Sequence, residues 1–337
     1  MPMSKPELIP PDRLVHADWG SDSKKRWMCV ASRQGGGYII RPPEPVGDLR
    51  TFWARVAQRS NGGSVLVGYD FPIGLPVAYA ERAGITHFTD SLLEFGHGPW
   101  SDFYRPAERQ DEVSIRRPFY PFRPGGTKQC HLVDGLGVES MRSLLRRCEH
   151  PTETRGAASP LFWTLGGKQV GRAAIIGWRD LLGPGIAGQS LDLRLWPFDG
   201  SLAELIAPGA LVVAETYPAE ACVHLGLTPP GRGWSKTSQS GREAQAGKLL
   251  DWAMMREVEV DDQLSRMIRD GFGEQKAAED PFDAMLGIMS MIEVALGYRN
   301  EGAPQDNEVR QVEGWILGQE APDAGVGGPG RQRHLGR

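Results

Sequence analysis

The chain is poor in cysteine and has no long hydrophobic run. Only 4 of its 337 residues are cysteines, and they form no CxxC pair, so a zinc site of that kind is not expected. Scattered, reduced thiols are typical of a cytoplasmic protein. No apolar stretch approaches the roughly 20 residues that a membrane-spanning helix needs, and residues 1–11 lack the apolar segment of a signal peptide. We therefore expect a soluble, cytoplasmic protein without a membrane partner.

An excess of positive charge is also missing, and so are several familiar catalytic motifs. The formal net charge is −4, so contact with nucleic acid would need a local basic patch. The histidines do not show metal-ligand spacing such as HExxH. There is no GxSxG elbow, no GxGxxG fingerprint and no GxxxxGK[ST] loop. These absences argue against the zinc-protease, serine-hydrolase, dinucleotide-binding and P-loop classes.

Apolar residues, at 40% of the chain, are plentiful enough to bury a large core. Three short strands are predicted first, at residues 13–18, 27–31 and 38–40. An amphipathic helix is expected after Asp48 and ends at 61–63. The nearly continuous apolar run at 64–69 then predicts a strand that is buried on both faces.

The second half of the chain returns to regular structure after an irregular stretch. Between residues 94 and 170, prolines, arginines and aromatics interleave, which indicates an insertion. Beyond it the pattern predicts a strand at 210–215 and three helices, at 242–255, 261–269 and 281–296. An antiparallel meander followed by helices and parallel strands implies a mixed α/β sheet with helices packed on it. The glycine-rich residues 322–337 are expected to be disordered.

Acidic side chains stand where the predicted apolar elements begin or end. Asp18, Asp70 and Glu215 each close a predicted strand, and Asp283 opens the last helix. Acids beside a hydrophobic core are costly unless something pairs with them, and in parallel sheets ligands bind outside the carboxyl ends of the strands. Hard cations take oxygen ligands. We therefore predict a Mg²⁺ or Mn²⁺ site, with turn or loop capping by each acid as the alternative.

The last helix bears on this prediction in two ways. Asp280 stands before a proline and is expected to cap the helix, so it is either a cap or a further metal ligand. Asp283 is followed by a helix that is apolar on nearly every face and is therefore expected to be buried. The small residues Gly287 and Ser290 follow Asp283 on its own face. They would let the helix approach the sheet closely.

Basic residues are concentrated within the predicted insertion. Between residues 113 and 132 there is no acid, and the basic residues there are Arg116, Arg117, Arg123 and Lys128. Arginines grip phosphates and aromatic rings stack on bases, so this stretch is a candidate substrate-binding segment, together with Lys168 in a glycine-rich cluster. The alternative is a proline-rich loop whose aromatics pin it to the core. A later basic stretch is expected to be a solvated surface: Arg232, Lys236, Arg242 and Lys248.

Several of these motifs together resemble a known family. They are VGYDFPIGLP at 67–76, AETYP at 214–218 and DPFDA at 280–284, with KQVG at 168–171 and EGWI at 313–316. In these, and in Asp18 followed by a hairpin, the chain resembles a family of predicted RNase H-like nucleases that is labelled as a domain of unknown function. The resemblance spans about residues 13–317, with 1–12 left as an extension.

The resemblance implies a fold and assigns roles to the acids. It implies an RNase H-like mixed five-stranded sheet flanked by helices, in which 94–170 is a large insertion. Asp18, Asp70 and Asp283 match the metal-binding acids of the wider superfamily. Asp280, one turn before Asp283, is similar to the arrangement in Holliday-junction resolvases. Glu215 matches the family's Glu-Thr-Tyr-Pro motif and would ligate a metal or orient water.

The expected function is metal-dependent phosphodiester cleavage, with nucleic acid or a nucleotide as the substrate. Two other functions remain open on the sequence. Asp18-Trp-Gly20 is compatible with the first phosphate loop of a phosphotransferase or ATPase of the actin and sugar-kinase fold, although a second DxGxGT loop is missing. The third possibility is a non-catalytic nucleic-acid- or protein-binding module in which the acids cap turns.

Overall fold

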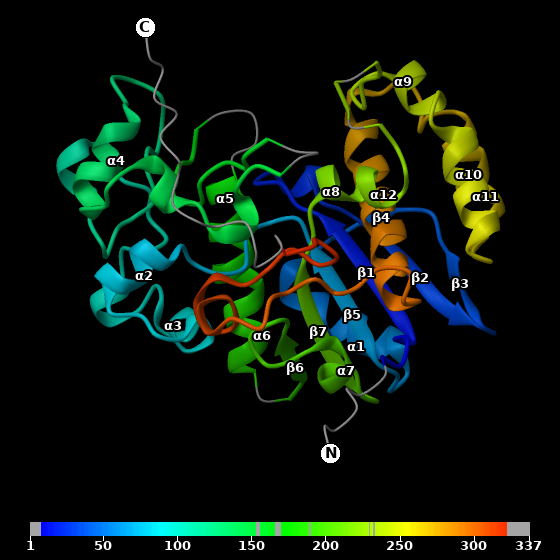
Figure 1. Cartoon of the computed structure of the whole chain (residues 1–337), viewed down its shortest axis with the longest axis horizontal. Coiled ribbons are helices and arrows are strands. Elements are labelled where there is room, and N and C mark those ends of the chain that lie inside the picture. Colours follow the sequence, from blue (N-terminus) through cyan, green and yellow to red (C-terminus); the bar gives the residue numbers. More distant parts are fainter. Residues whose placement is uncertain are drawn as a thin grey trace, which may run out of the picture.

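The structure, a computed structural model, describes residues 8–152, 156–165, 170–188, 190–228, 230–231 and 233–321 (Figure 1). The expectations for Lys168, for Arg232 and for a disordered tail at 322–337 lie outside these residues. None of the described helices is both long enough and apolar enough to cross a membrane.

One mixed sheet of eight strands runs through the part of the chain that the structure describes. Its strands are β1 (Arg13–Asp18), β2 (Trp27–Gln34), β3 (Gly37–Ile40), β4 (Glu44–Pro45), β5 (Val65–Tyr69), β6 (Asp192–Leu195), β7 (Ala210–Glu215) and β8 (Glu259–Val260). They lie in the order β6-β7-β5-β1-β2-β3-β8, with β4 paired to β2. The α/β class with a mixed sheet is confirmed. Three short strands, β4, β6 and β8, enlarge the sheet beyond the five that were expected.

Strand β2 runs opposite to its neighbours β1, β3 and β4, so the strand direction changes on both sides of β2. The β1–β2 and β2–β3 pairs are antiparallel, whereas β1, β5, β7 and β6 are mutually parallel neighbours. The carboxyl ends of β1, β5 and β7 therefore lie at one edge of the sheet, beside the start of the last helix (Figure 1). This is the edge at which ligands bind in sheets with parallel strands.

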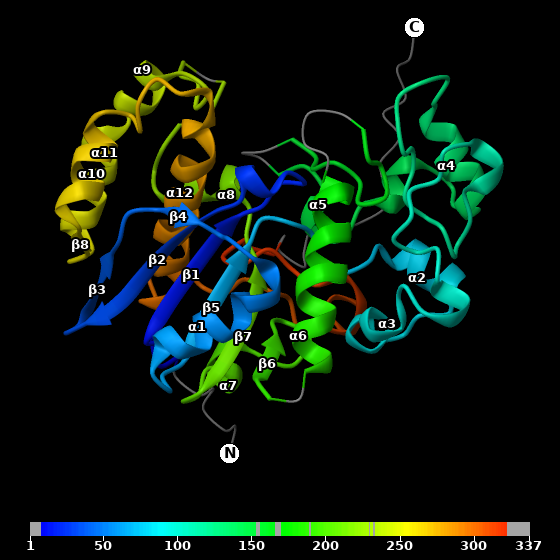
Figure 2. The ribbon, with the colours of Figure 1, turned by 180° about the vertical axis from the view of Figure 1, so that it is seen from behind.

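Helices cover both faces of the sheet (Figures 1 and 2). They are α1 (Phe52–Ser60), α2 (Val77–Ala83), α3 (Phe88–Glu94), α4 (Gln129–Leu136), α5 (Val170–Gly177), α6 (Gly183–Ala187), α7 (Leu202–Leu205), α8 (Pro218–His224), α9 (Gln239–Glu243), α10 (Ala246–Met255), α11 (Asp262–Arg269) and α12 (Glu279–Ala295). Because strand side chains alternate between faces, β5 sends Val67 and Tyr69 toward α1 and α5, and Leu66 toward α12.

Helix α12 is buried on every side, as its sequence predicts: all residues from Pro281 to Ala295 are buried. It crosses β1 so closely that a Cβ at Gly287 would collide with the ring of His16. The expected close approach at Gly287 is therefore confirmed. Ser290 serves a different contact, because its hydroxyl hydrogen-bonds to Nδ1 of His224 in α8 at 2.6 Å.

Two helix predictions need correction. The helix predicted at 242–255 is divided into α9 and α10, which are separated by Ala244 and Gln245. The last helix begins at Glu279 after a 3₁₀ turn, with Ala278 at the capping position. Asp280 therefore lies inside the first helical turn and does not cap the helix.

Candidate metal centre

Asp18 and Asp70 leave the sheet side by side. Strands β1 and β5 are parallel with Ala17 opposite Tyr69, so the next residue of each strand faces the same way. Both aspartates are in phase with residues that pack against α12, such as Leu14 in β1 and Leu66 in β5. The two carboxyl groups influence each other's pKa, and the backbone N–H of Trp19 donates to Asp70 at 2.6 Å.

Asp283 joins this pair from the first turns of α12. Its charge acts on both strand aspartates, and Asp280 adds to the effect on Asp18. The structure therefore brings together Asp18, Asp70 and Asp283, with Asp280 close by. These residues are far apart in the sequence, and the strand register and the position of α12 are what place them at one edge.

The acids are held in an environment that opposes their ionisation. Burial is the largest cause that raises the pKa of Asp18, and the charges of the neighbouring aspartates raise it further. Burial also raises the pKa of Asp70 to about 7 and that of Asp280 to about 6. The pKa of Asp283 is raised by burial as well, although Lys236 opposes this. Raised pKa values in a cluster of acids mark a site that a cation would stabilise.

His16 fixes the position of α12 relative to the strands. It is fully buried, and its two ring nitrogens contact Ala284 O at 3.1 Å and Thr216 Oγ1 at 2.9 Å. Because a carbonyl only accepts, Nδ1 carries the hydrogen and Nε2 accepts from the threonine hydroxyl. Ala284 follows Asp283, so this contact sets the place of that carboxylate. Sequence reasoning missed His16; its only signal was a polar residue inside an apolar strand.

Lys236 forms ion pairs at the start of α12, beside the aspartates. Its ammonium group pairs with Asp283, and with Glu279 at 3.2 Å. Arg242 is also buried and donates to the backbone oxygen of Lys236 at 2.5 Å. The expectation of a solvated basic surface is therefore wrong for Lys236 and Arg242. The linear sequence held no sign of the pairing, because Lys236 reaches Asp283 from a separate loop.

The donor set fits a hard divalent cation. Asp18, Asp70 and Asp283 offer only oxygen ligands, and Oδ1 of Asp283 is buried without a hydrogen-bond partner among the residues that the structure describes. Among the described residues, however, no group of three or more His, Cys, Asp or Glu side chains is arranged around a common point as metal ligands. Instead, Asp283 pairs with Lys236, and Asp70 accepts from the backbone N–H of Trp19.

Glu215 lies apart from the aspartates. It faces Tyr69 in the β5–β7 register and is in phase with Val213, so its side chain emerges on the sheet face opposite α12. There both carboxylate oxygens accept hydrogen bonds from the fully buried Arg146, each at 2.7 Å. The next residue, Thr216, takes the place on the aspartate side and contacts His16. The structure therefore does not bring Glu215 to the predicted metal site.

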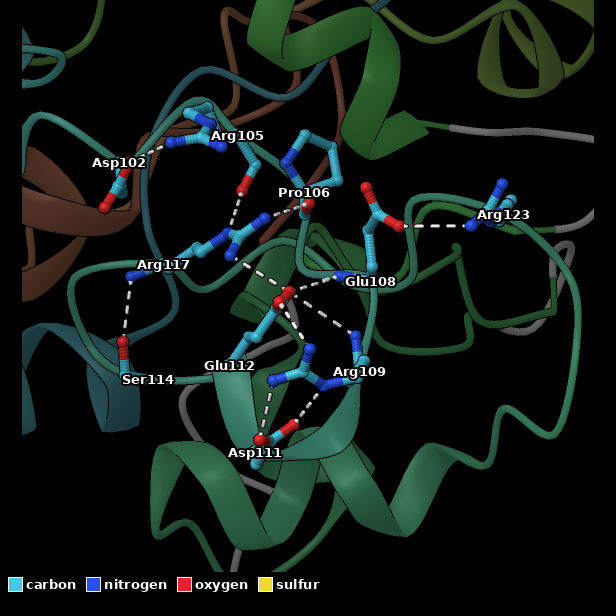
Figure 3. Close-up of polar contacts among 10 residues, drawn as sticks. All are labelled: Asp102, Arg105, Pro106, Glu108, Arg109, Asp111, Glu112, Ser114, Arg117 and Arg123. Carbon is cyan, nitrogen blue, oxygen red and sulfur yellow. Dashed lines mark hydrogen bonds and ion pairs between the residues drawn. The ribbon is translucent and has the colours of Figure 1, made fainter.

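The basic segment of the insertion is tied to its own surroundings. Arg117 donates to the backbone oxygens of Arg105 and Pro106, both at 3.0 Å, and pairs with Glu112 at 2.9 Å (Figure 3). Arg123 is exposed and pairs with Glu108 at 3.3 Å (Figure 3). These contacts hold one loop together and do not involve the aspartates.

The remaining residues of this segment support the same interpretation. The guanidinium of Arg116 lies over the ring of Trp100 at 3.6 Å, and Lys128 is exposed just before α4. Phe119 and Tyr120 are buried in the core, whereas Phe122 is 45% exposed. The aromatics thus mainly pin the loop to the core, which was the alternative left open by the sequence.

No protein-family model, no curated protein and no solved structure matches the chain.

Proposed function

We propose that this chain is a Mg²⁺- or Mn²⁺-dependent phosphodiesterase that acts on nucleic acid or a nucleotide through Asp18, Asp70 and Asp283. The observation that carries the proposal is the convergence of three carboxyl groups from β1, β5 and α12 at one sheet edge. Acids buried together raise one another's pKa. Such a cluster of buried acids is costly by itself, and it is expected where a cation completes the site.

The topology supports an RNase H-like interpretation of the fold. The antiparallel strands β1, β2 and β3 are followed by β5 and β7, which run parallel to β1. Helix α12 carries its acid onto one face of this sheet. Such a sheet agrees with the architecture that the sequence resemblance implies.

Each residue would have a defined part in the reaction. A divalent cation, when bound, supplies a Lewis acid for a phosphate oxygen and an activated water. Asp18 and Asp70 would hold it from the strand ends, and the N–H of Trp19 keeps the Asp70 carboxylate oriented. Asp283 would complete the set from the helix. Asp280 is less buried and lies near Lys25, so it would act at the outer side of the site.

The proposal is tested by measuring Mn²⁺ binding to the wild type and to Asp70→Asn by calorimetry. The amide can still accept the Trp19 hydrogen bond, so the fold should be kept, while loss of the charge should weaken Mn²⁺ binding by about 100-fold. Cleavage of DNA, RNA and nucleotide substrates should be abolished in the same variant. Asp251→Asn, at an exposed position of α10, is the matched control and should bind and cleave like the wild type.

Two results would contradict the proposal. One is a wild type that binds neither Mn²⁺ nor Mg²⁺, which would favour a non-catalytic binding module. The other is an Asp70→Asn variant that binds Mn²⁺ and cleaves substrate as well as the wild type does.

A further inference from the structure

We propose that Lys236 is a displaceable internal cation: its ammonium group pairs with Asp283, and it turns to a phosphate oxygen of the substrate when a divalent cation binds. This rests on the proposed function of the same site. It assigns a second, phosphate-binding role to a residue outside the acid cluster.

The contacts of Lys236 place its ammonium where a metal would compete with it. The ammonium pairs with Oδ2 of Asp283, and Glu279, one helical turn earlier in α12, is its second partner at 3.2 Å. The other oxygen of Asp283 is buried, and no described residue forms a hydrogen bond with it. One positive group thus compensates several carboxyl groups, and its charge acts on Asp18 and Asp70 as well.

The backbone of Lys236 is held by a hydrogen bond, whereas its side chain is held by two ion pairs and is partly exposed. Arg242 holds the loop by donating to Lys236 O at 2.5 Å, to Gly271 O at 2.7 Å and to Gly273 O at 2.9 Å. The Lys236 side chain is 30% exposed, while that of Asp283 is only 7% exposed. A flexible four-carbon stem on a fixed backbone gives the ammonium a short range of positions near the site.

Electrostatics predicts what metal binding does to this arrangement. A divalent cation and an ammonium are of like charge and compete for the same Asp283 carboxylate. Displacement leaves Lys236 near Glu279 and close to the site, where a phosphodiester supplies a new anionic partner. An ammonium binds phosphate as a point charge. Lys236 is therefore expected to bind a phosphate group of the substrate, next to the metal.

The test compares Mn²⁺ binding to the wild type and to Lys236→Gln by calorimetry, without substrate. Because the variant lacks the competing charge, its Mn²⁺ affinity should rise about tenfold. Mn²⁺ should also raise its unfolding temperature more than that of the wild type, since Asp283 is unpaired until the metal binds. A phosphorothioate dinucleotide, added with Mg²⁺, should bind the variant about tenfold more weakly. Lys248→Gln, at an exposed position of α10, is the control and should change none of these values.

The outcomes separate the two proposals. If the wild type binds neither metal ion, the proposed function fails and this inference fails with it. If the wild type binds Mn²⁺ but Lys236→Gln binds it equally well or more weakly, only the role of Lys236 is overturned, because a purely structural lysine would give that result. Unchanged affinity for the phosphorothioate dinucleotide would likewise overturn its phosphate-binding role.

Discussion

At the scale of single residues, His16 links the strands to α12 as a neutral group. Burial lowers its pKa to about 4, and the hydrogen bond to Ala284 only partly opposes this. The ordinary pKa of a histidine in an unfolded chain is about 6.5. Between about pH 4 and pH 6.5, His16 is therefore protonated in the unfolded chain and neutral in the folded chain. The stabilisation that neutral His16 provides is therefore complete above about pH 6.5 and is lost as the pH falls toward 4.

We therefore expect His16→Gln to reduce the acid sensitivity of folding. The free energy of unfolding of the wild type should fall by about 3 kcal/mol more than that of the variant between pH 7 and pH 4. Urea unfolding at both pH values measures this difference. The aspartates with raised pKa make the free energy of unfolding rise as the pH falls, but they do so equally in both proteins. The difference between the two proteins therefore reports on His16 alone. His87→Gln, at an exposed position, is the control; an equal pH slope in His16→Gln and the wild type would contradict the assignment.

The position of each residue in its helix, strand or loop determined whether the sequence could predict its place in the site. Asp18, Asp70 and Asp283 were predicted because each stands at the boundary of an apolar element. Lys236 was not, since its partner lies on another element and long-range pairs leave no periodic signal. Glu215 was placed in the site because it ends a strand. A shift of one residue moves a side chain to the other face of a sheet, and the sequence alone did not show on which face Glu215 emerges.

At the scale of elements, the distance between α12 and β1 depends on a glycine. In an exposed helix, replacing glycine by alanine stabilises the protein by about 1 kcal/mol. At Gly287 the added methyl group would meet the His16 ring. We expect Gly287→Ala to lower the free energy of unfolding by about 1–3 kcal/mol.

Gly247→Ala, in α10, is the matched control for Gly287→Ala in α12. Gly247 lies in α10, and a Cβ there would meet no atom within 4 Å. This variant should be as stable as the wild type or more stable by up to about 1 kcal/mol. Denaturant unfolding of both variants checks the prediction, and a Gly287→Ala protein as stable as Gly247→Ala would show that α12 does not depend on the close approach.

The elements themselves were predicted unequally. Strands β1, β5 and β7 and the buried helix α12 have long or continuous apolar patterns, and the sequence predicted them within two residues. Strands β4 and β8 have two residues each and β6 has four. Two-residue segments carry too little periodicity to be recognised, since sheet pairing rather than local pattern defines them. Strand β6 was missed although β3, which also has four residues, was predicted.

At the scale of the whole molecule, Arg146 joins the insertion to the sheet. Besides Glu215, its guanidinium contacts Glu149, and it donates to Ile73 O at 3.1 Å and to Glu313 O at 3.0 Å. The carboxylate of Glu215 thus serves the architecture rather than the aspartate cluster.

We therefore expect Glu215→Gln to affect stability and not metal binding. The change leaves Arg146 with one charged partner fewer in a fully buried position, which should cost about 3 kcal/mol of unfolding free energy. Mn²⁺ affinity measured by calorimetry should stay within about twofold of the wild-type value. Glu215 lies on the other face of the sheet, so its loss should hardly change the metal affinity of the aspartates. A folded Glu215→Gln protein that no longer binds Mn²⁺ would make Glu215 a ligand after all.

The guanidinium of Arg146 also has a consequence for how the chain assembles. It bonds to Ile73 before the insertion, to Glu149 within it and to Glu215 after it. A misplaced segment would leave a charge or a carbonyl group unpaired in a dry interior, and such groups are expensive. Partly assembled forms are thus penalised, so we expect this side chain to couple folding of the insertion to folding of the sheet.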